Sequence, residues 1–372
     1  MIPFRVSTGW INVNVVSIID VDERKVTATI GVDEYYLGAG NPYDIICSPD
    51  GQSVYVSLTG TRELSTIDTA GLLGDFARRT MQPMMAVWPI YLSLGESLWR
   101  RTRLSGNGPR GLAAVGSKVY VAQYFSDSLA VVDLEDPQAP AVETIPLGPP
   151  PQLTLQRRGE LLFHDALICY QHWVSCASCH PDARTDGLNW DLMNDGSGNP
   201  KNTKSMLLAH RTPPAMAEGV RETAEVAVRS GINHILFSDR PEEEAAAIDA
   251  YLKDLRPVPS PYLVDGRLSP AAERGRELFK SRRVACHRCH PSPLYTDLKS
   301  HNVGSQTKYE RTDRFDTSTL IEVWRTAPYL HDGRYLTVKE LLIEGKHGLP
   351  GSRADDLSKQ EIDDLVEFVL SL

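Results

Sequence analysis

Hydrophobic and polar residues alternate with a period of two through much of residues 1–150, which is the pattern of half-buried β-strands. Three segments with this pattern resemble one another and end in aspartate: VVSIID (15–20), ELSTID (63–68) and SLAVVD (128–133). Turn sequences that contain glycine, followed by VYV, accompany the second and third segments. The pattern therefore predicts short antiparallel strands joined by tight turns.

The strand pattern first recurs after about 48 residues, a spacing typical of β-propeller blades. Residues 1–150 resemble bacterial surface propellers built on a YVTN-type repeat, and residues 71–101 are predicted to be a helical insertion. A closed propeller takes about four to eight blades, whereas this region has strands for only two or three. We expect the open blades to be completed by blades upstream of residue 1, by another subunit as in a homodimer, or by packing on the rest of the chain.

The hydrophobic period becomes helical after the proline-rich stretch PLGPPPQ at 146–152, and the sequence beyond it is duplicated. A constant shift of 114 residues aligns several pairs: Arg211 with Arg325, Thr212 with Thr326, and Pro214 with Pro328. Each copy is predicted to open with a helix and to close with an amphipathic one. The fold class is thus multidomain, with partial propeller-like blades followed by two tandem all-α domains, a first repeat at 151–256 and a second repeat at 257–372.

Each repeat contains one motif of the form Cys-x-x-Cys-His, and the two motifs start 110 residues apart. Two intervening residues place both sulfurs on one side of a helical turn, where each can add to a vinyl group of a porphyrin. The following histidine can then bind the iron. The motifs predict two covalently bound haem c groups, held by Cys176, Cys179, His180, Cys286, Cys289 and His290.

Two other uses of these cysteines fit less well. A zinc site would need both Cys-x-x-Cys pairs at one ion, but the pairs are far apart in sequence and each has its own histidine. A thioredoxin-like dithiol would need a strand followed by a helix and would have no use for the trailing histidine. Haem attachment explains every residue of both motifs.

The composition is that of an ordinary globular protein, with 41% hydrophobic residues and a net charge of −9 over 372 residues. An acidic chain without a long basic block argues against nucleic acid or anionic lipid as partner. The most apolar stretch, 81–99, contains prolines and polar residues, so no membrane span is predicted. Haem c is attached outside the bacterial cytoplasmic membrane, so we expect a periplasmic or otherwise extracytoplasmic protein, although residues 1–16 lack a signal-peptide pattern.

The run DTSTLIEVWRTAPYLHDGR at 316–334 follows the second motif. With that motif it resembles the second domain of bacterial dihaem cytochrome c peroxidases and of the related methylamine-utilisation dihaem enzyme, over about residues 155–372. The resemblance implies that electrons pass from a redox partner, such as a small c-type cytochrome, between two haems, one of which can react with peroxide. It also implies a Ca²⁺ ion held at positions that match Asn202, Thr326 and Pro328.

The chain departs from that family at two positions. Ala217-Glu218-Gly219 replaces the usual Trp-Asp-Gly run, and no methionine stands near Gly345. Histidines recur at corresponding places, however, so His234 and His347 are predicted as distal haem ligands, and His234 also as the residue that moves a proton in catalysis. The rival candidates for the distal positions are Met193, Met216, His210 and His331, of which we expect His331 to be structural.

Three functions remain open from the sequence. The first is a dihaem oxidoreductase of the peroxidase type, and the second is a non-catalytic dihaem carrier in which both irons have two histidines. The third, from the methylamine-utilisation branch, is an oxidase that acts on a protein or small-molecule partner. The sixth iron ligand decides between the first two, because peroxide needs an open position.

Overall fold

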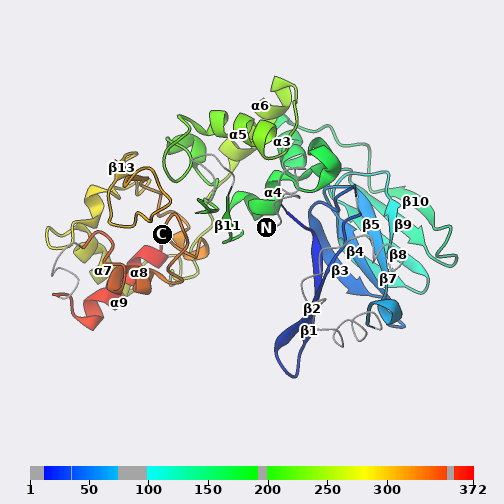
Figure 1. Ribbon diagram of the computed structural model, residues 1–372, viewed down its shortest axis with the longest axis horizontal. Coiled ribbons are helices and arrows are strands. Elements are labelled where there is room, and N and C mark those ends of the chain that lie inside the picture. Colours follow the sequence, from blue (N-terminus) through cyan, green and yellow to red (C-terminus); the bar gives the residue numbers. More distant parts are fainter. Residues whose placement is uncertain (1–11, 35, 74–98, 192–198, 350–355) are drawn as a thin grey trace. The chain divides into compact units, whose positions relative to one another are not determined.

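The computed structural model describes residues 12–34, 36–73, 99–191, 199–349 and 356–372 (Figure 1). The chain divides into two compact units. The N-terminal unit comprises Met1–Ser178 and Gly231–Ile248, and the C-terminal unit comprises Cys179–Ser230 and Asp249–Leu372. The domain boundaries that the sequence suggests, after residues 150 and 256, stay predictions.

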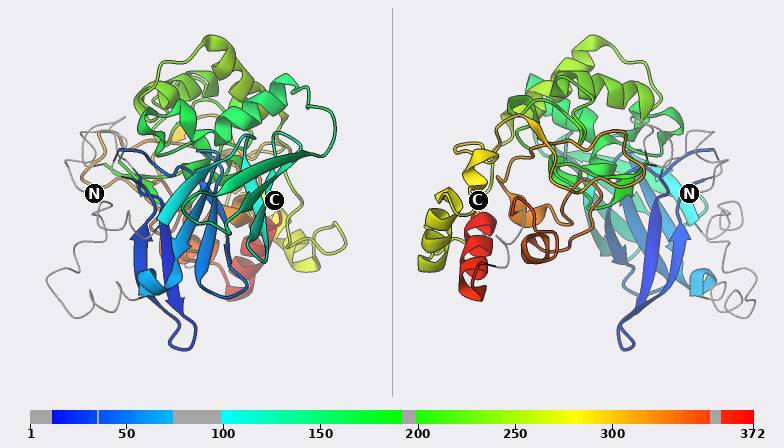
Figure 2. Two further views of the ribbon diagram at one scale, coloured as in Figure 1. Left: turned by 90° about the vertical axis from the view of Figure 1, so that its right-hand side faces the viewer. Right: turned by 60° about the vertical axis from the view of Figure 1, so that its left-hand side comes forward.

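The N-terminal unit contains a β-hairpin and two four-stranded antiparallel sheets, drawn in blue to cyan-green (Figure 2). The hairpin pairs β1 (Val15–Asp20) with β2 (Lys25–Gly31). The middle sheet consists of β3 (Pro42–Cys47), β4 (Ser53–Leu58), β5 (Glu63–Asp68) and β6 (Trp99–Arg103), in that order. The outer sheet has β7 (Pro109–Val115), β8 (Lys118–Gln123), β9 (Ser128–Asp133) and β10 (Ala141–Pro146), each paired with the next.

The three repeated sequence segments are strands β1, β5 and β9, with the predicted bounds. Each four-stranded sheet is a simple meander, as in a propeller blade, but the described strands form no closed ring. Most of the predicted helical insertion, residues 74–98, lies outside the described residues. Its last three residues, 99–101, belong to strand β6 instead, because they pair with β5.

Alternation along the strands buries both faces of the middle sheet. On one face, Val56 packs in a cluster with Ile18 of the hairpin. On the other face, Tyr55 and Leu64 pack in a cluster with Val119 of the outer sheet. Successive residues of a strand point to opposite faces, so Tyr55 and Val56 pack in two different hydrophobic clusters. The hairpin and the two sheets are therefore three stacked layers.

Helices and short turns form the remainder of the chain. The first repeat has α3 (Leu155–His164), η3 (Ala166–Ile168), η4 (Tyr170–His172), α4 (Cys176–Cys179), η5 (Pro181–Ala183), β11 (Asn189–Trp190), β12 (Lys201–Asn202), η6 (Ala209–Arg211), α5 (Ala224–His234) and α6 (Glu242–Asp254). The second repeat has α7 (Pro270–Lys280), η7 (Cys286–Arg288), β13 (Ser300–His301), β14 (Phe315–Asp316), η8 (Val323–Arg325), α8 (Val338–Ile343) and α9 (Lys359–Leu370). Short hairpins therefore accompany the helices in both repeats.

The opening and closing helices of each repeat cross at a glycine. A Cβ on Gly159 of α3 would lie 1.8 Å from the carbonyl oxygen of Ala247 in α6. A Cβ on Gly275 of α7 would lie 1.9 Å from the carbonyl oxygen of Asp364 in α9. Such a close backbone approach leaves no room for any side chain, so the same helix crossing is built into both repeats.

Local signals define where the helices of the second repeat start. Ser269 accepts a hydrogen bond from Ala272 N at 3.0 Å and precedes Pro270, as the sequence predicts. Ser358 and Glu361 form a capping box at the start of α9. These caps satisfy backbone N–H groups that a helix cannot satisfy internally.

Loops of the strand region contact the chain segment that precedes the first haem motif, within the N-terminal unit. Arg62 pairs with Asp165 at 2.6 Å, and Ala166 N donates to the carbonyl of Gly60 at 2.9 Å. Gly38 N donates to the carbonyl of Gln171 at 2.7 Å. The strand region therefore packs on this segment, which is one of the three ways in which its open blades were expected to be covered.

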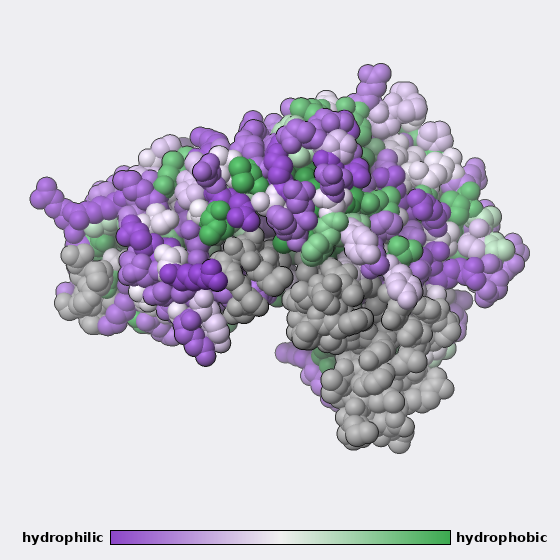
Figure 3. All heavy atoms as spheres, turned by 45° about the horizontal axis from the view of Figure 1, so that its top comes forward, coloured by the Kyte–Doolittle hydropathy of each residue, from purple (hydrophilic) through white to green (hydrophobic). Residues whose placement is uncertain are grey.

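The described surface in Figure 3 is mostly hydrophilic, and hydrophobic residues are scattered among the polar ones. Within the described ranges, no helix combines the length and the hydropathy needed to cross a bilayer.

The glycine crossings predict the effect of adding one methyl group. We expect Gly275→Ala to lower the free energy of unfolding by about 3 kcal/mol, because α7 and α9 must move apart. Gly231→Ala is the matched control, since a Cβ there has nothing within 4 Å and α5 should gain about 0.5–1 kcal/mol. Chemical denaturation of the two variants measures both changes, and equal stability of the two would contradict the close crossing.

Candidate haem-binding sites

The two cysteines of each motif lie on one helical turn, as the spacing predicts. Cys176 and Cys179 are the first and last residues of α4. Cys286 is the first residue of η7, and Cys289 follows the last residue of η7. All four cysteines are partly exposed. The geometry fits two thioether bonds to one porphyrin at each turn.

A hydrogen bond fixes the orientation of the histidine in each motif. His180 Nδ1 lies 3.0 Å from the carbonyl oxygen of Arg184, and His290 Nδ1 lies 2.9 Å from that of Tyr295. A carbonyl can only accept, so Nδ1 carries the proton and the lone pair of Nε2 is free for iron. Burial lowers the pKa of both imidazoles, which keeps them neutral as a metal ligand must be. The side chains present therefore fit a haem in each repeat.

An ion pair anchors the residue whose carbonyl orients His180. Arg184 donates from Nε and Nη2 to the two carboxylate oxygens of Glu322, at 2.9 and 2.8 Å. Glu322 also accepts from Val258 N at 2.7 Å. Burial raises the pKa of Glu322, but the hydrogen bonds from Arg184 and Val258 outweigh burial and hold that pKa below its usual value. No sequence motif marks this pair, because its members stand 138 residues apart.

The second cysteine of each motif has a carboxylate and a ring nearby. Asp186 N and Asp297 N donate to the carbonyls of Cys179 and Cys289, at 3.1 and 2.9 Å. The carboxylate of Asp186 accepts a hydrogen bond from the ring nitrogen of Trp190 at 2.8 Å. The carboxylate of Asp297 lies 2.8 Å from the ring nitrogen Nε2 of His301. Donor atoms of Cys289, Asp297 and His301 could together approach a metal ion, but a thioether bond would occupy this cysteine. We therefore interpret the group as part of the surroundings of the second haem.

His347 lies within electrostatic range of His290 in the C-terminal unit. Burial and the neighbouring His290 lower the pKa of His347 to about 4. The Nδ1 atom of His347 is buried and has no hydrogen-bond partner within the described part of the chain. The role of His347 as the distal ligand of the second haem stays a prediction.

The other predicted distal ligands have different surroundings. His234 is exposed at the C-terminal end of α5, and its role stays a prediction. His210 Nε2 pairs with Asp249 at 2.9 Å, and Met216 occupies a left-handed turn. Met193 lies outside the described residues.

His331 belongs to a buried polar network, as expected for a structural residue. Its Nε2 lies 3.1 Å from Glu310, and its ring stacks on Phe315 with centroids 3.9 Å apart. Glu310 also accepts from Thr307 N and Oγ1, at 2.5 and 2.6 Å, and pairs with Lys201 at 3.4 Å. Burial raises the pKa of Glu310, but the hydrogen bonds from Thr307 and the nearby charges outweigh it and lower the pKa to about 2. No sequence motif marks Glu310 or Lys201.

The predicted calcium residues come partly together in the C-terminal unit. A Cβ on Gly333 would lie 2.9 Å from both Asn202 Nδ2 and Pro328 Cγ, so these two residues are near neighbours. Asn202 Nδ2 donates to Asn189 Oδ1 at 3.0 Å, and Thr326 Oγ1 donates to the carbonyl of Val323 at 3.1 Å. The side-chain amide oxygen of Asn202 and the backbone carbonyl oxygens of Thr326 and Pro328 are the type of donor that Ca²⁺ prefers. The site fits in donor type and stays a prediction.

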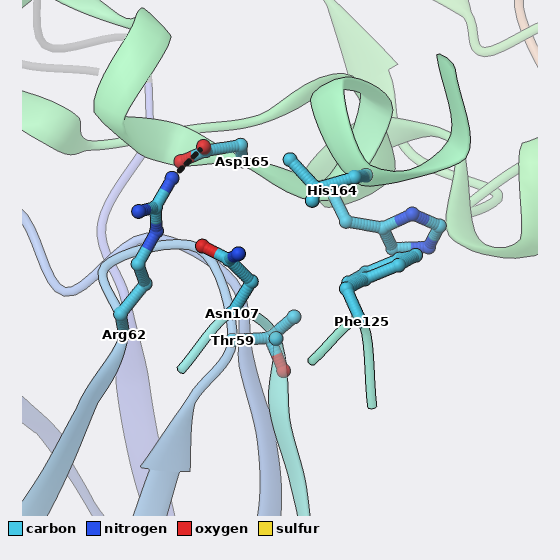
Figure 4. A pocket seen from close by; sticks show the side chains of 8 residues that line it. Thr59, Arg62, Asn107, Phe125, His164 and Asp165 are labelled. Carbon is cyan, nitrogen blue, oxygen red and sulfur yellow. Dashed lines mark hydrogen bonds and ion pairs between the residues drawn. The ribbon is translucent and has the colours of Figure 1, made fainter. Parts of the chain in front are cut away.

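A hollow of about 170 Å³ lies in the N-terminal unit, between sheet loops and the end of α3 (Figure 4). Thr59, Arg62, Asn107 and Phe125 approach it from the loops, and Asp165 from the helical side. It contains neither a motif cysteine nor a predicted haem ligand. We therefore assign it to the packing of the strand region.

The chain is similar in sequence and in fold to a subunit of hydrazine synthase. The chain is 29% identical to hydrazine synthase subunit gamma of Kuenenia stuttgartiensis, over 59% of this chain and 77% of that protein. A chain of Kuenenia stuttgartiensis hydrazine synthase, in crystals pressurised with 20 bar xenon, superposes with a TM-score of 0.54 and 25% identity, over 60% of this chain and 88% of that one. The chain matches no family model.

A third protein has a lower structural similarity. It is a MauG-like protein associated with microbial copper homeostasis, which superposes with a TM-score of 0.48 and 23% identity over 61% of this chain and 91% of that chain.

The Arg184–Glu322 pair gives a test of the first haem site. Glu322→Gln leaves a buried guanidinium without its counter-charge, so we expect the free energy of unfolding to fall by about 3 kcal/mol and the spectrum of only one haem to change. The control Asp254→Asn removes a carboxylate from an exposed pair, 3.7 Å from Arg256, and should cost less than about 0.5 kcal/mol. If both variants unfold alike, Glu322 does not support the site.

Glu310 predicts a pH dependence of stability. Its folded pKa of about 2 lies below the ordinary value of 4.5, so its stabilisation is complete above about pH 4.5 and is lost as pH falls through 2. We expect Glu310→Gln to be less stable than the native protein at pH 6 and to approach it at pH 2.5, in urea unfolding. Glu344→Gln, an exposed control, should follow the native curve at both values.

Proposed function

We propose that the chain is a dihaem c-type oxidoreductase that passes electrons between two covalently attached haems. The observation that carries this proposal is the hydrogen bond from Nδ1 of each motif histidine to a following backbone carbonyl, which makes Nε2 the unprotonated nitrogen that can bind iron in both repeats. Similarity to hydrazine synthase subunit gamma supports a redox enzyme of this general kind. When bound, the two irons supply one-electron redox chemistry.

The two sites are proposed to differ in their distal ligands. In the second repeat, His347 lies within electrostatic range of His290 and would serve as a second histidine ligand of the iron, which would close that site to substrate. In the C-terminal unit, the rival His210 and His331 are held by the carboxylates of Asp249 and Glu310. We therefore propose that the haem held by His180 is the one open to substrate, with His234 available to move a proton.

Peroxide is the substrate that the family resemblance implies for the open haem. A redox partner such as a small c-type cytochrome would supply the electrons, in an extracytoplasmic compartment where haem c is attached. The purely electron-carrying alternative requires both irons to be six-coordinate, so the ligand state separates the two proposals.

The experiment uses holoprotein matured in a host competent for cytochrome c assembly. A pyridine haemochrome assay and intact mass should show two covalent haems, and Cys286→Ala with Cys289→Ala should leave one. A native protein with fewer than two covalent haems would overturn the proposal.

Spin state tests the assignment of the ligands. We expect one low-spin and one high-spin haem in the native protein, and conversion of the low-spin signal to high spin in His347→Ala. The matched control His234→Ala should keep the native spin pattern. Two low-spin haems that peroxide does not perturb would favour the electron carrier, and loss of the low-spin signal in His234→Ala would place the ligand in the first repeat.

The similarity to hydrazine synthase favours a second candidate, in which the substrate is a small nitrogen compound and the chain is one subunit of a larger assembly. Optical titration of the high-spin haem with hydrazine and with peroxide compares the two substrates directly. Tighter binding of hydrazine, without turnover of peroxide, would favour this second candidate.

A further inference from the structure

The segments that lead into the two haem motifs differ sharply in charge. We define the first attachment segment as residues 163–180 and the second as residues 279–290, each running from a matched phenylalanine to the motif histidine. The first contains one aspartate and no lysine or arginine. The second contains no acidic residue and four cations: Lys280, Arg282, Arg283 and Arg288. This cationic run stands in a chain whose net charge is −9.

Most of these cations are available to an outside partner. All four side chains belong to exposed residues. Arg283 is bound to Glu361, whereas Lys280, Arg282 and Arg288 form no ion pair with any residue that the structure describes. An exposed cation without a counter-charge keeps its full attraction for an anionic surface. The charge of the second attachment segment is therefore not neutralised by the described residues.

The two attachment segments also differ in what covers them. Strand loops bind the first segment through Arg62 to Asp165, Gly60 to Ala166 and Gly38 to Gln171. Side chains of the second segment bond only within the second repeat, as far as the described residues go: Arg283 to Glu361 and Asp356, and His287 to Phe279. Strand loops thus bind this part of the sequence in the first repeat, whereas the second attachment segment packs on its own repeat through Phe279 and Val284 and presents its four cations at exposed positions.

We propose that the second attachment segment is the docking surface for an acidic redox protein. This proposal rests on the proposed function, because it needs a haem at Cys286 and Cys289. Thioether bonds would hold the porphyrin edge to these two partly exposed residues, so a partner on this segment would lie close to the haem. The net negative charge repels an acidic partner elsewhere, and the cations therefore set where it binds.

A reduced flavodoxin, a small acidic flavoprotein, is the probe for this surface. One electron passes from the reduced flavin to the ferric haem, and stopped-flow absorbance follows the rate. In the native protein we expect this rate to fall as ionic strength rises, although both proteins are negatively charged overall, because opposite local charges are being screened. A rate that rises with ionic strength would overturn the proposal without any variant.

Charge removal gives the second readout. We expect Lys280→Gln, Arg282→Gln and Arg288→Gln together to slow the reaction by roughly 10-fold at low ionic strength and to abolish its decrease with salt. A control with the same change of net charge replaces exposed cations of the strand region: Arg24→Gln, Arg103→Gln and Lys118→Gln. It should leave the rate within about twofold. If both triple variants react equally slowly, the net charge of the protein explains the effect and the docking site is overturned.

Further measurements separate failure of the site from failure of the function. Oxidation by the cationic tris(phenanthroline)cobalt(III) ion should be unchanged or faster in the first triple variant, so slowing with this reagent would indicate a damaged haem site and overturn the proposal. Preferential binding of the segment to phosphatidylserine vesicles over flavodoxin would assign it to a lipid surface instead. Absence of the second haem from the native protein would overturn the proposed function itself. If the native protein contains two haems but the first triple variant reacts with flavodoxin at the native rate, only the proposed docking site is overturned.

Discussion

The hydrogen bond from Nδ1 of each motif histidine to a backbone carbonyl is the interaction on which both candidate haem sites depend. It fixes the tautomer and makes Nε2 the nitrogen that can bind iron. In the first repeat the carbonyl belongs to Arg184, and the guanidinium of that residue is held by Glu322 of the second repeat. The second repeat therefore helps to orient the iron ligand of the first, which makes the two repeats depend on each other.

The duplication has kept its backbone and changed its surroundings. Gly159 and Gly275 impose the same helix crossing, and His180 and His290 make the same hydrogen bond. Between helix and motif, however, one copy contacts sheet loops and is almost uncharged, while the other is exposed and cationic. Backbone contacts tolerate little change, whereas exposed side chains can vary at small cost in stability. The two haem sites can therefore carry different partners on one scaffold.

Buried charges in the C-terminal unit are satisfied in groups. Glu322 has Arg184 and the backbone of Val258, and Glu310 has Thr307, Lys201 and His331. A carboxylate taken out of water is costly unless such partners replace its hydration. These groups tie segments that are more than 100 residues apart, so they hold the second half of the chain in one arrangement.

The sequence by itself determined the elements whose causes are local. Alternation predicted strands β1, β5 and β9 with their observed bounds, and the motif spacing placed each cysteine pair on one turn; the caps at Ser269 and Ser358 are likewise local. These features depend on neighbours within a few residues. The tertiary structure decided that His347 lies within electrostatic range of His290, that Glu322 supports Arg184, and that strand loops bind the first attachment segment. Each of these contacts joins residues distant in sequence, and no local pattern encodes which distant segment will pack against another.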